Sequence, residues 1–287
     1  MCFLAGVNAP NHWLLASNSD NPYTTVNHLL ADHGGPRSYL AVRVLVPDDG
    51  ADVPWAGMLT RGVNDAGLGF TYAFVLEQGM ADYPAQAWTA RMLANASTVD
   101  EALTYFSAGS TLPGNYLVAD RPGGMAVVEV GAHGIEVRAP EGSGAPRSNV
   151  WQCLPGGIEP EWDAETVSTH RYARGVALLG ELGEATPEAL QTVLRDHQED
   201  GGTVGQHGRS LCNHGTTNGT ISCEIIDPTG HLWFGFGPPC GTRQGHEQDS
   251  RTAWGRLVRF SLRPGSGSGD LTTPAGEITP LGARLMS

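Results

Sequence analysis

The sequence predicts an α+β fold with antiparallel sheets, on three observations. Segments with strand-like patterning come in groups separated by Gly/Pro turns, helical segments come in two pairs between those groups, and no strand alternates singly with a helix as in a βαβ fold. Composition shows no break, so residues 1–264 are predicted to form a single domain. The GSGSGD stretch makes residues 265–287 a C-terminal extension that is partly flexible.

The first strands form a hairpin around the turn residues Pro10 and Asn11. With the turn centred on Pro10, residues whose numbers sum to about 20 pair, which places Cys2 opposite Asn18. A strand at 38–46 and two strands within 58–75 follow.

The remaining elements follow from helical spacing, turn residues and caps, with Ser97 and Thr98 before the second helix and Thr186 and Pro187 at the start of the last one. We expect helices at 85–96, 100–106, 165–182 and from 186 onward, strands at 114–120, 125–131 and 134–140, an irregular segment at 147–160, and a last hairpin at 219–237.

Charge and composition narrow the classes of function. The net charge of −13 and the pI near 5.1 argue against nucleic acid and anionic membranes as partners. The N-terminal stretch lacks a basic secretory n-region, so a cytoplasmic location is expected. All basic residues other than histidine are arginine, which excludes lysine Schiff-base chemistry, and GxGxxG and Walker loops are absent, so no cofactor is expected.

The five cysteines predict neither a disulfide framework nor a zinc ribbon, because their number is odd and no CxxC pair occurs. Cys212, Cys223 and Cys240 are expected to be small buried residues. His197, His207 and His214 show no i,i+4 pair on a helix, so no metal site is expected.

The Met1-Cys2 start offers a chemical possibility. If Met1 is removed, Cys2 carries both a thiol, with an ordinary pKa of about 8.5, and an α-amine, with one of about 7.7–8.0, so the amine can take the thiol proton. Asp20, just beyond the paired strand, is then within reach to orient the new N-terminus. A cysteine without function and a surface-turn aspartate remain the plain alternatives.

A set of short motifs, in a fixed order along the chain, resembles the motifs of a known protein family. They are Cys2, NSD at 18–20, GVNDAGLGFT at 62–71, GNYLVAD at 114–120, SN at 148–149, HRYAR at 170–174, DHQEDG at 196–201, SLCNH at 210–214, and TISCEIIDP and LWFGFGPPC within 220–240. Together they resemble the Ntn-hydrolase superfamily, and within it the acyl-CoA:6-aminopenicillanate acyltransferase-like group related to choloylglycine hydrolases and penicillin V acylases.

The resemblance implies a four-layer αββα sandwich with two stacked antiparallel sheets and an N-terminal nucleophile at Cys2. Asp20 matches the carboxylate beside the N-terminus, and Asn149 matches an asparagine that helps hold the oxyanion. Arg171 matches an arginine near the active centre; a place on the helix surface remains open for it, and Arg174 is an alternative one turn away.

Three departures from the family pattern indicate an altered substrate or a weakened enzyme. Ser17 replaces an arginine of choloylglycine hydrolases, Ala73 or Phe74 aligns with a second oxyanion asparagine, and Asn213 replaces another arginine. The candidate substrate-binding residues are Ser17, Asn18, Tyr72, Ala73 and Phe74. Tyr72, Phe74 and Trp55 line an acyl pocket or pack in the core.

The expected function is an amidohydrolase that cleaves a linear C–N amide bond of a small acylated substrate through an acyl-enzyme on Cys2. Acyl transfer to an amine is an alternative, and a catalytically quiet ligand-binding protein of the same fold is another. The expected partner is a small molecule, and a homo-oligomer stays open.

Overall fold

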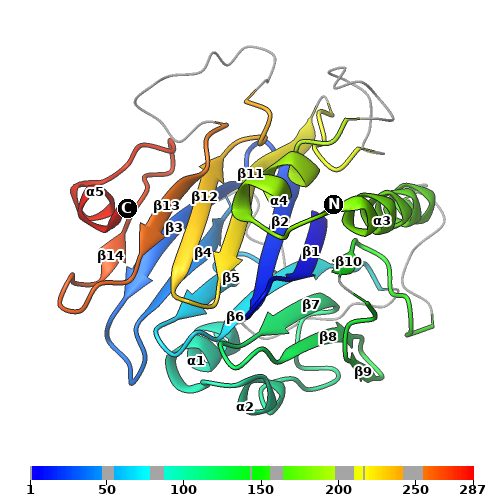
Figure 1. Cartoon of the computed structure of the whole chain (residues 1–287), viewed down its shortest axis with the longest axis horizontal. Helices are drawn as coiled ribbons and strands as arrows, with labels where there is room; N and C mark the ends of the chain where they lie inside the picture. The colour runs from blue at the N-terminus through cyan, green and yellow to red at the C-terminus, as the bar shows by residue number, and fades with distance from the viewer. Residues whose placement is uncertain are drawn as a thin grey trace.

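The computed structural model describes residues 2–46, 55–77, 87–142, 144–155, 164–197, 210–215, 217–241 and 255–287. Within them the chain forms two stacked antiparallel sheets, of six and eight strands, with helices against the outer face of each (Figure 1). The predicted α+β class and its αββα layering are confirmed. His207 and residues 198–201 of the DHQEDG motif lie outside the described residues.

The six-stranded sheet carries the N-terminus. Its order is β10 (Gly144–Arg147), β1 (Cys2–Asn8), β2 (Trp13–Pro22), β11 (Asn218–Asp227), β12 (His231–Phe236) and β13 (Val258–Ser261). Helices α3 (Ala164–Glu181) and α4 (Pro187–Leu194) cover its outer face. Thr186 caps α4 by accepting a hydrogen bond from the Ala189 amide, and Pro187 starts the helix, as the sequence predicts.

The eight-stranded sheet is covered on its outer face by two short helices. Its order is β14 (Gly269–Asp270), β3 (Val26–Asp32), β4 (Tyr39–Leu45), β5 (Leu59–Asn64), β6 (Gly69–Phe74), β7 (Gly114–Ala119), β8 (Met125–Val130) and β9 (Ile135–Arg138). The helices are α1 (Trp88–Asn95) and α2 (Val99–Leu103), the latter capped by Thr98. Their apolar residues pack on Phe70, Tyr72 and Tyr116.

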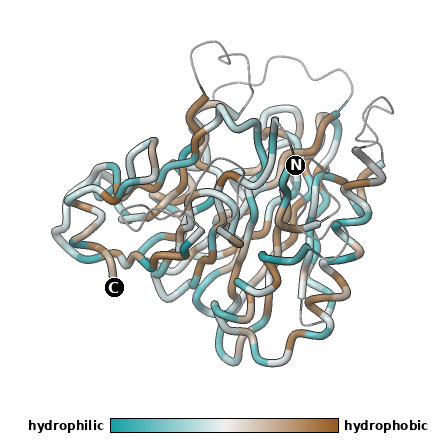
Figure 2. Tube along the Cα trace, turned by 90° about the horizontal axis from the view of Figure 1, so that it is seen from above, coloured by the Kyte–Doolittle hydropathy of each residue, from teal (hydrophilic) through white to brown (hydrophobic). Residues whose placement is uncertain are grey.

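Strand alternation produces the layers. In β1, Cys2 and Leu4 join the core between the two sheets, whereas Phe3 and Ala5 join the core under α3 and α4. Brown hydrophobic stretches accordingly recur through the middle of the molecule in Figure 2. The face on which a strand residue lies therefore decides whether its side chain reaches the space between the sheets.

The register of the first hairpin differs from the prediction by one residue. Cys2 pairs with Ser19, and Asn18 pairs with Phe3. The connection has an even number of residues, with the Ala9 amide donating to the His12 carbonyl, so the turn centres between Pro10 and Asn11. A one-residue change in register moves the facing side chain to the other side of the sheet.

The C-terminal residues are part of the sandwich. Residues from 265 onward, expected as a partly flexible extension, contribute β14, which pairs with β3, and α5 (Pro280–Leu285). Leu271 and Leu285 are fully buried in the core between the sheets. Their burial makes the end of the chain a structural component of the eight-stranded sheet's edge.

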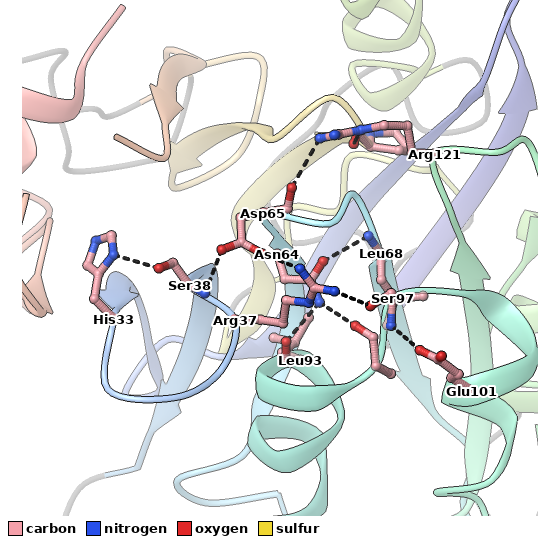
Figure 3. A network of polar contacts seen from close by, with 12 residues as sticks. His33, Arg37, Ser38, Asn64, Asp65, Leu68, Leu93, Ser97, Glu101 and Arg121 are labelled. Carbon is pink, nitrogen blue, oxygen red and sulfur yellow. Dashed lines mark hydrogen bonds and ion pairs between the residues drawn. The ribbon is translucent and has the colours of Figure 1, made fainter. Parts of the chain in front are cut away.

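The turn after β5 is fastened to the helical layer by Asn64 (Figure 3). Its buried side chain donates to the carbonyls of Leu93 and Ala96, at 2.8 and 2.7 Å, and accepts from the Leu68 amide at 3.0 Å. Arg37 and Ser38 contact the neighbouring Asp65. These bonds satisfy backbone groups at the end of α1 that would otherwise lack partners.

In the described part of the chain, every helix is either too short or too polar to cross a lipid bilayer.

Candidate active site

Cys2 lies at the start of β1, beside α3 and α4 (Figure 1), and its side chain belongs to the core between the sheets with Leu4 and Ala73. Only 8% of the residue is exposed. Its backbone nitrogen donates a hydrogen bond to Oδ1 of Asn149. In a chain that starts at Cys2, this nitrogen is the α-amine.

Asn149 follows the edge strand β10 and links two parts of the molecule. Its Nδ2 donates to the carbonyl of Phe74, at the end of β6, while its Oδ1 faces the Cys2 nitrogen. Asn115 holds the backbone on both sides of it by donating to the carbonyls of Ser148 and Val150, at 2.7 and 2.9 Å. Asn115 escaped the sequence analysis, although a polar residue in the apolar segment GNYLVA was a usable signal.

Asp20 and Arg171 form a buried ion pair, with 2.8 Å between Oδ2 and Nη1. The Thr220 hydroxyl donates to Asp20 Oδ1 at 2.7 Å, and Arg171 Nη2 donates to the Leu211 carbonyl at 3.0 Å. The arginine therefore comes from the interior face of α3. Arg174, the alternative, instead pairs with Asp196 at 2.7 Å and is partly exposed.

The predicted site residues on and beside β2 fall into two groups, one on each face of the sheet. Asn18 lies on the helix side of β2 and donates to the carbonyls of Leu194 and Leu211, both at 2.8 Å. Asp20, two residues on, reaches Arg171 on that same side. Cys2 and Ser17 lie on the other side, between the sheets. The Asn18 side chain thus links β2 to the end of α4 and to the segment before β11.

Ser17 belongs to a buried charged cluster between the sheets. Its hydroxyl donates to Glu224 at 2.7 Å and accepts from Arg61 Nε at 3.1 Å, and Arg61 lies 3.2 Å from the same carboxylate. Arg61 comes from β5, so a guanidinium from the opposite sheet lies beside Ser17. Neither Arg61 nor Glu224 was singled out from the sequence.

Hydrogen bonds continue from this cluster to the residue opposite Cys2. Ser222 donates to Glu224, Asn27 donates to Ser222 at 2.8 Å, and Asn27 also donates to Ser19 at 2.8 Å. Because Ser19 pairs with Cys2 in the hairpin, these polar groups extend through the space between the sheets to the Cys2 position. They give an otherwise apolar core a polar side next to the thiol.

Burial raises the pKa of Glu224, and the opposing effects of Arg61 and the two serine hydroxyls are smaller. A carboxyl whose pKa is raised in the folded state takes a proton there before the unfolded chain does. The ordinary pKa of a glutamate is 4.5. The stability that Glu224 contributes should therefore decrease as the pH rises from 4.5 towards neutrality. Urea unfolding across that range should show wild-type stability falling relative to Glu224→Gln.

The exposed Glu277 supplies the matched control for this titration. Glu277→Gln should leave the wild-type pH profile of the unfolding free energy unchanged. A difference between wild type and Glu224→Gln that stays constant with pH would contradict the assignment.

The candidate substrate-binding residues Tyr72, Ala73 and Phe74 lie on two different faces of β6. Ala73 faces Cys2 between the sheets, but Tyr72 packs under the helices against Tyr116 and donates to the Pro113 carbonyl at 2.9 Å. Phe74 also packs on that outer side, with its ring centroid 4.7 Å from that of Trp55. Of these candidates, only Ala73 shares the core cluster of Cys2.

A cavity of about 520 Å³ lies between α3, β10 and the β8–β9 hairpin. Its lining includes Arg138, Arg147, Cys153 and Tyr172. Cys2, Asp20, Asn149 and Arg171 are not among its lining residues, so the cavity is separate from the candidate active site.

The sulfur and imidazole residues after α4 form an unexpected group. His197, Cys212, His214 and Cys240 each offer a ligand atom, and these atoms all lie within 4.8 Å of one another. The search for i,i+4 histidine pairs and CxxC motifs missed the group because its members come from three separate segments. Cys223 is fully buried in the core under α3 and α4, as expected.

Asn213, the third departure from the family pattern, lies in this same segment and is buried. Its backbone amide donates to the Thr220 hydroxyl at 2.9 Å, and its carbonyl accepts from the Thr220 amide. Because Thr220 also bonds Asp20, the segment at 210–215 is directly connected to the ion pair.

Comparisons with known proteins find similarity to one family model and to solved structures. Residues 7–149 match the family model described as acyl-coenzyme A:6-aminopenicillanic acid acyl-transferase. Curated protein sequences yield no match.

Among solved structures, the C2A mutant of conjugated bile acid hydrolase from Clostridium perfringens matches with a TM-score of 0.53 at 10% sequence identity, over 95% of this chain and 97% of that chain. Penicillin V acylase from Agrobacterium tumefaciens matches with a TM-score of 0.49 at 16% identity, over 92% of each chain. The first of these likenesses shows a shared fold.

Proposed function

We propose that the chain is an enzyme of the Ntn-hydrolase superfamily and that Cys2 is the nucleophile with which it breaks the C–N bond of an acylated amide. The αββα fold and the match of residues 7–149 to an acyl-transferase family support this proposal. The contact between the Cys2 nitrogen and Asn149 carries this proposal. It orients the nitrogen that becomes the base on the same residue as the thiol.

The reaction requires that the peptide bond before Cys2 be cut. The freed α-amine takes the thiol proton, and Sγ attacks the carbonyl carbon of the substrate, so that the C=O electron pair moves onto oxygen. When this tetrahedral intermediate collapses, the C–N bond breaks, and the leaving nitrogen receives the proton from the α-amine. A thioester then remains on Cys2.

Asn149 has two roles in this proposal. Its Oδ1 holds the amine, and of the two hydrogens on its Nδ2, one is donated to Phe74 and the other serves the oxyanion. Asp20 and Arg171 act as positioning residues, because they pair with each other on the helix side of β2 while the sulfur lies between the sheets.

The proposed substrate is a small molecule with an apolar acyl group. Leu4, Ala73 and Leu117 share the core cluster of Cys2, so an acyl chain bound there meets hydrocarbon. The neighbouring Ser19 and Asn27 supply hydrogen-bonding groups on one side.

Water resolves the thioester in hydrolysis, and an amine resolves it in acyl transfer. The description of the matching family favours an amine as acceptor, whereas the hydrolase fold relative favours water. We propose hydrolysis as the basal reaction and aminolysis as its competitor, since both use the same thioester.

The test compares two forms of the untagged chain, one starting at Cys2 and one retaining Met1, each verified by intact mass. Both are incubated with a panel of acylated amines that differ in the acyl group, quenched with acid, and digested for peptide mass mapping. The form starting at Cys2 should yield free amine and an acyl adduct on its N-terminal peptide, and the other form should yield neither. Absence of adduct and product from both forms across the panel would refute the proposal.

A competing amine separates hydrolysis from transfer. It should divert the acyl group into a new amide without changing the rate at which the first amine is released, provided that acylation is rate-limiting. A new amide in the form that retains Met1 would show that the reaction does not pass through Cys2.

A further inference from the structure

We infer that His197, Cys212, His214 and Cys240 bind one zinc ion, separately from the proposed reaction at Cys2. The four come from the end of α4, the segment before β11, and the turn after β12. Two thiolates and two imidazoles in a compact group are a characteristic ligand set for structural zinc.

The distances between the ligand atoms fit tetrahedral coordination. With Zn–S bonds of about 2.3 Å and Zn–N bonds of about 2.05 Å, a regular tetrahedron separates two sulfurs by about 3.8 Å, sulfur and nitrogen by about 3.6 Å, and two nitrogens by about 3.3 Å. The two sulfurs are 3.6 Å apart, His214 Nε2 lies 3.4 and 3.2 Å from them, and the two Nε2 atoms are 3.0 Å apart. Each of these four edges is shorter than ideal by only a few tenths of an ångström, and the two edges from His197 to the sulfurs are no longer than 4.8 Å.

Charge and burial also suit zinc. Two thiolates balance the charge of Zn²⁺, so the complete site with neutral imidazoles carries no net charge and can lie in the interior. Cys212 and His214 are buried, and His197 and Cys240 are partly buried. Because the protein supplies all four ligands, the site is closed and therefore structural.

The distance between the sulfurs of Cys212 and Cys240 argues against a disulfide between them. A disulfide needs its sulfurs about 2.05 Å apart, so these sulfurs would have to approach by roughly 1.5 Å. Their separation of 3.6 Å is already within about 0.2 Å of the tetrahedral edge.

The surrounding backbone is arranged to hold the ligands in place. The Cys212 amide donates to the Asp196 carbonyl at 3.2 Å, which joins the segments that carry the first two ligands. Arg195 Nε donates to the Pro239 carbonyl at 2.8 Å, which brings the Cys240 turn to the end of α4. Zinc would add a further link between these three segments.

The location gives the metal a structural task near the candidate active site. Leu211, next to Cys212, accepts hydrogen bonds from both Arg171 and Asn18. By fixing the segment at 210–215, zinc would stabilise the surroundings of the Asp20–Arg171 pair without touching substrate.

Metal analysis of the untagged protein, expressed in zinc-supplemented medium and kept reduced, tests the inference. Elemental analysis should find about one zinc per chain, and chelation followed by zinc alone should lower and then restore the unfolding temperature. Cobalt alone, added to the chelated protein, should produce the visible absorption of tetrahedral cobalt and a thiolate charge-transfer band.

Cys240→Ser removes one ligand, and Cys153→Ser, outside the group, is the matched control. Cys240→Ser should weaken zinc binding by about 100-fold or more, and Cys153→Ser should bind as wild type does. If Cys240→Ser fails to fold, the cobalt spectrum of the wild type still shows whether thiolates bind the metal. A chain without zinc and without a thiolate–cobalt band, a Cys212–Cys240 disulfide that persists in reduced preparations, or equal zinc binding by both variants would overturn the inference.

Discussion

Cys2→Ala is expected to lower kcat/KM by about 10⁴-fold or more on any acylated amide that the enzyme turns over, because no thioester can form without the nucleophile. The fold should survive, since the substitution removes one sulfur from a residue that pairs with Ser19 of β2 through its strand backbone. Steady-state kinetics with the form starting at residue 2, together with circular dichroism, measure both effects.

Cys153→Ala is the control for thiol loss elsewhere, and Cys2→Ser tests the chemistry itself. The first should retain wild-type kcat/KM, because Cys153 lies outside the candidate site and its backbone amide donates a hydrogen bond to Glu129. Cys2→Ser keeps a weaker nucleophile beside the same amine and should be slow but measurable. Turnover by Cys2→Ala at a rate close to wild type would exclude Cys2 as the nucleophile.

Arg171→Met should lower the free energy of unfolding by about 3–5 kcal/mol, because it leaves the Asp20 carboxylate buried without its opposite charge. Arg174→Met is the matched control on the same helix. Its ion pair with Asp196 is partly exposed, so its loss should cost about 1 kcal/mol or less. Urea unfolding at neutral pH compares the two.

Adding Asp20→Asn to Arg171→Met should restore part of the lost stability, since the double variant buries no unpaired charge. The double-mutant cycle then measures how strongly the two side chains are coupled. If Arg171→Met costs no more than Arg174→Met, or if the double variant is no more stable than Arg171→Met, the two residues do not form the buried pair on which the site geometry depends.

Local signals predicted much of the fold. The opening hairpin, the caps at Thr98 and Thr186 and the final hairpin all depend on neighbouring residues, and all appear in the structure. β3 was missed because Asn27 and His28 are both buried in it, which breaks the expected alternation. β10 was missed because Pro146 suggests an irregular segment, although a sheet edge tolerates a residue without an amide hydrogen.

The site was predicted in part, and its non-local contacts were not. Family motifs pointed to Cys2, Asp20, Asn149 and Arg171, and the structure joins them as two pairs. Their relative placement depends on the hairpin register, which rests on whether the turn centres on or beside Pro10.

Contacts between the two sheets have no signature in local sequence. Arg61 reaches Ser17 and Glu224 only because β5 stacks over β2 and β11, and its position in β5 alone does not reveal this. The group of His197, Cys212, His214 and Cys240 is equally hidden, because only the folded chain brings its three segments together.

The hydrogen bond between the Cys2 nitrogen and Asn149 has a practical consequence for how the protein is produced. An affinity tag joined ahead of Cys2 turns that nitrogen into an amide, so under the proposed mechanism the tagged protein would be inactive. Ser287, which follows α5, is exposed, so an affinity tag attached after it leaves the Cys2 nitrogen unchanged. An inactive preparation is therefore evidence against the enzyme only when no tag precedes Cys2.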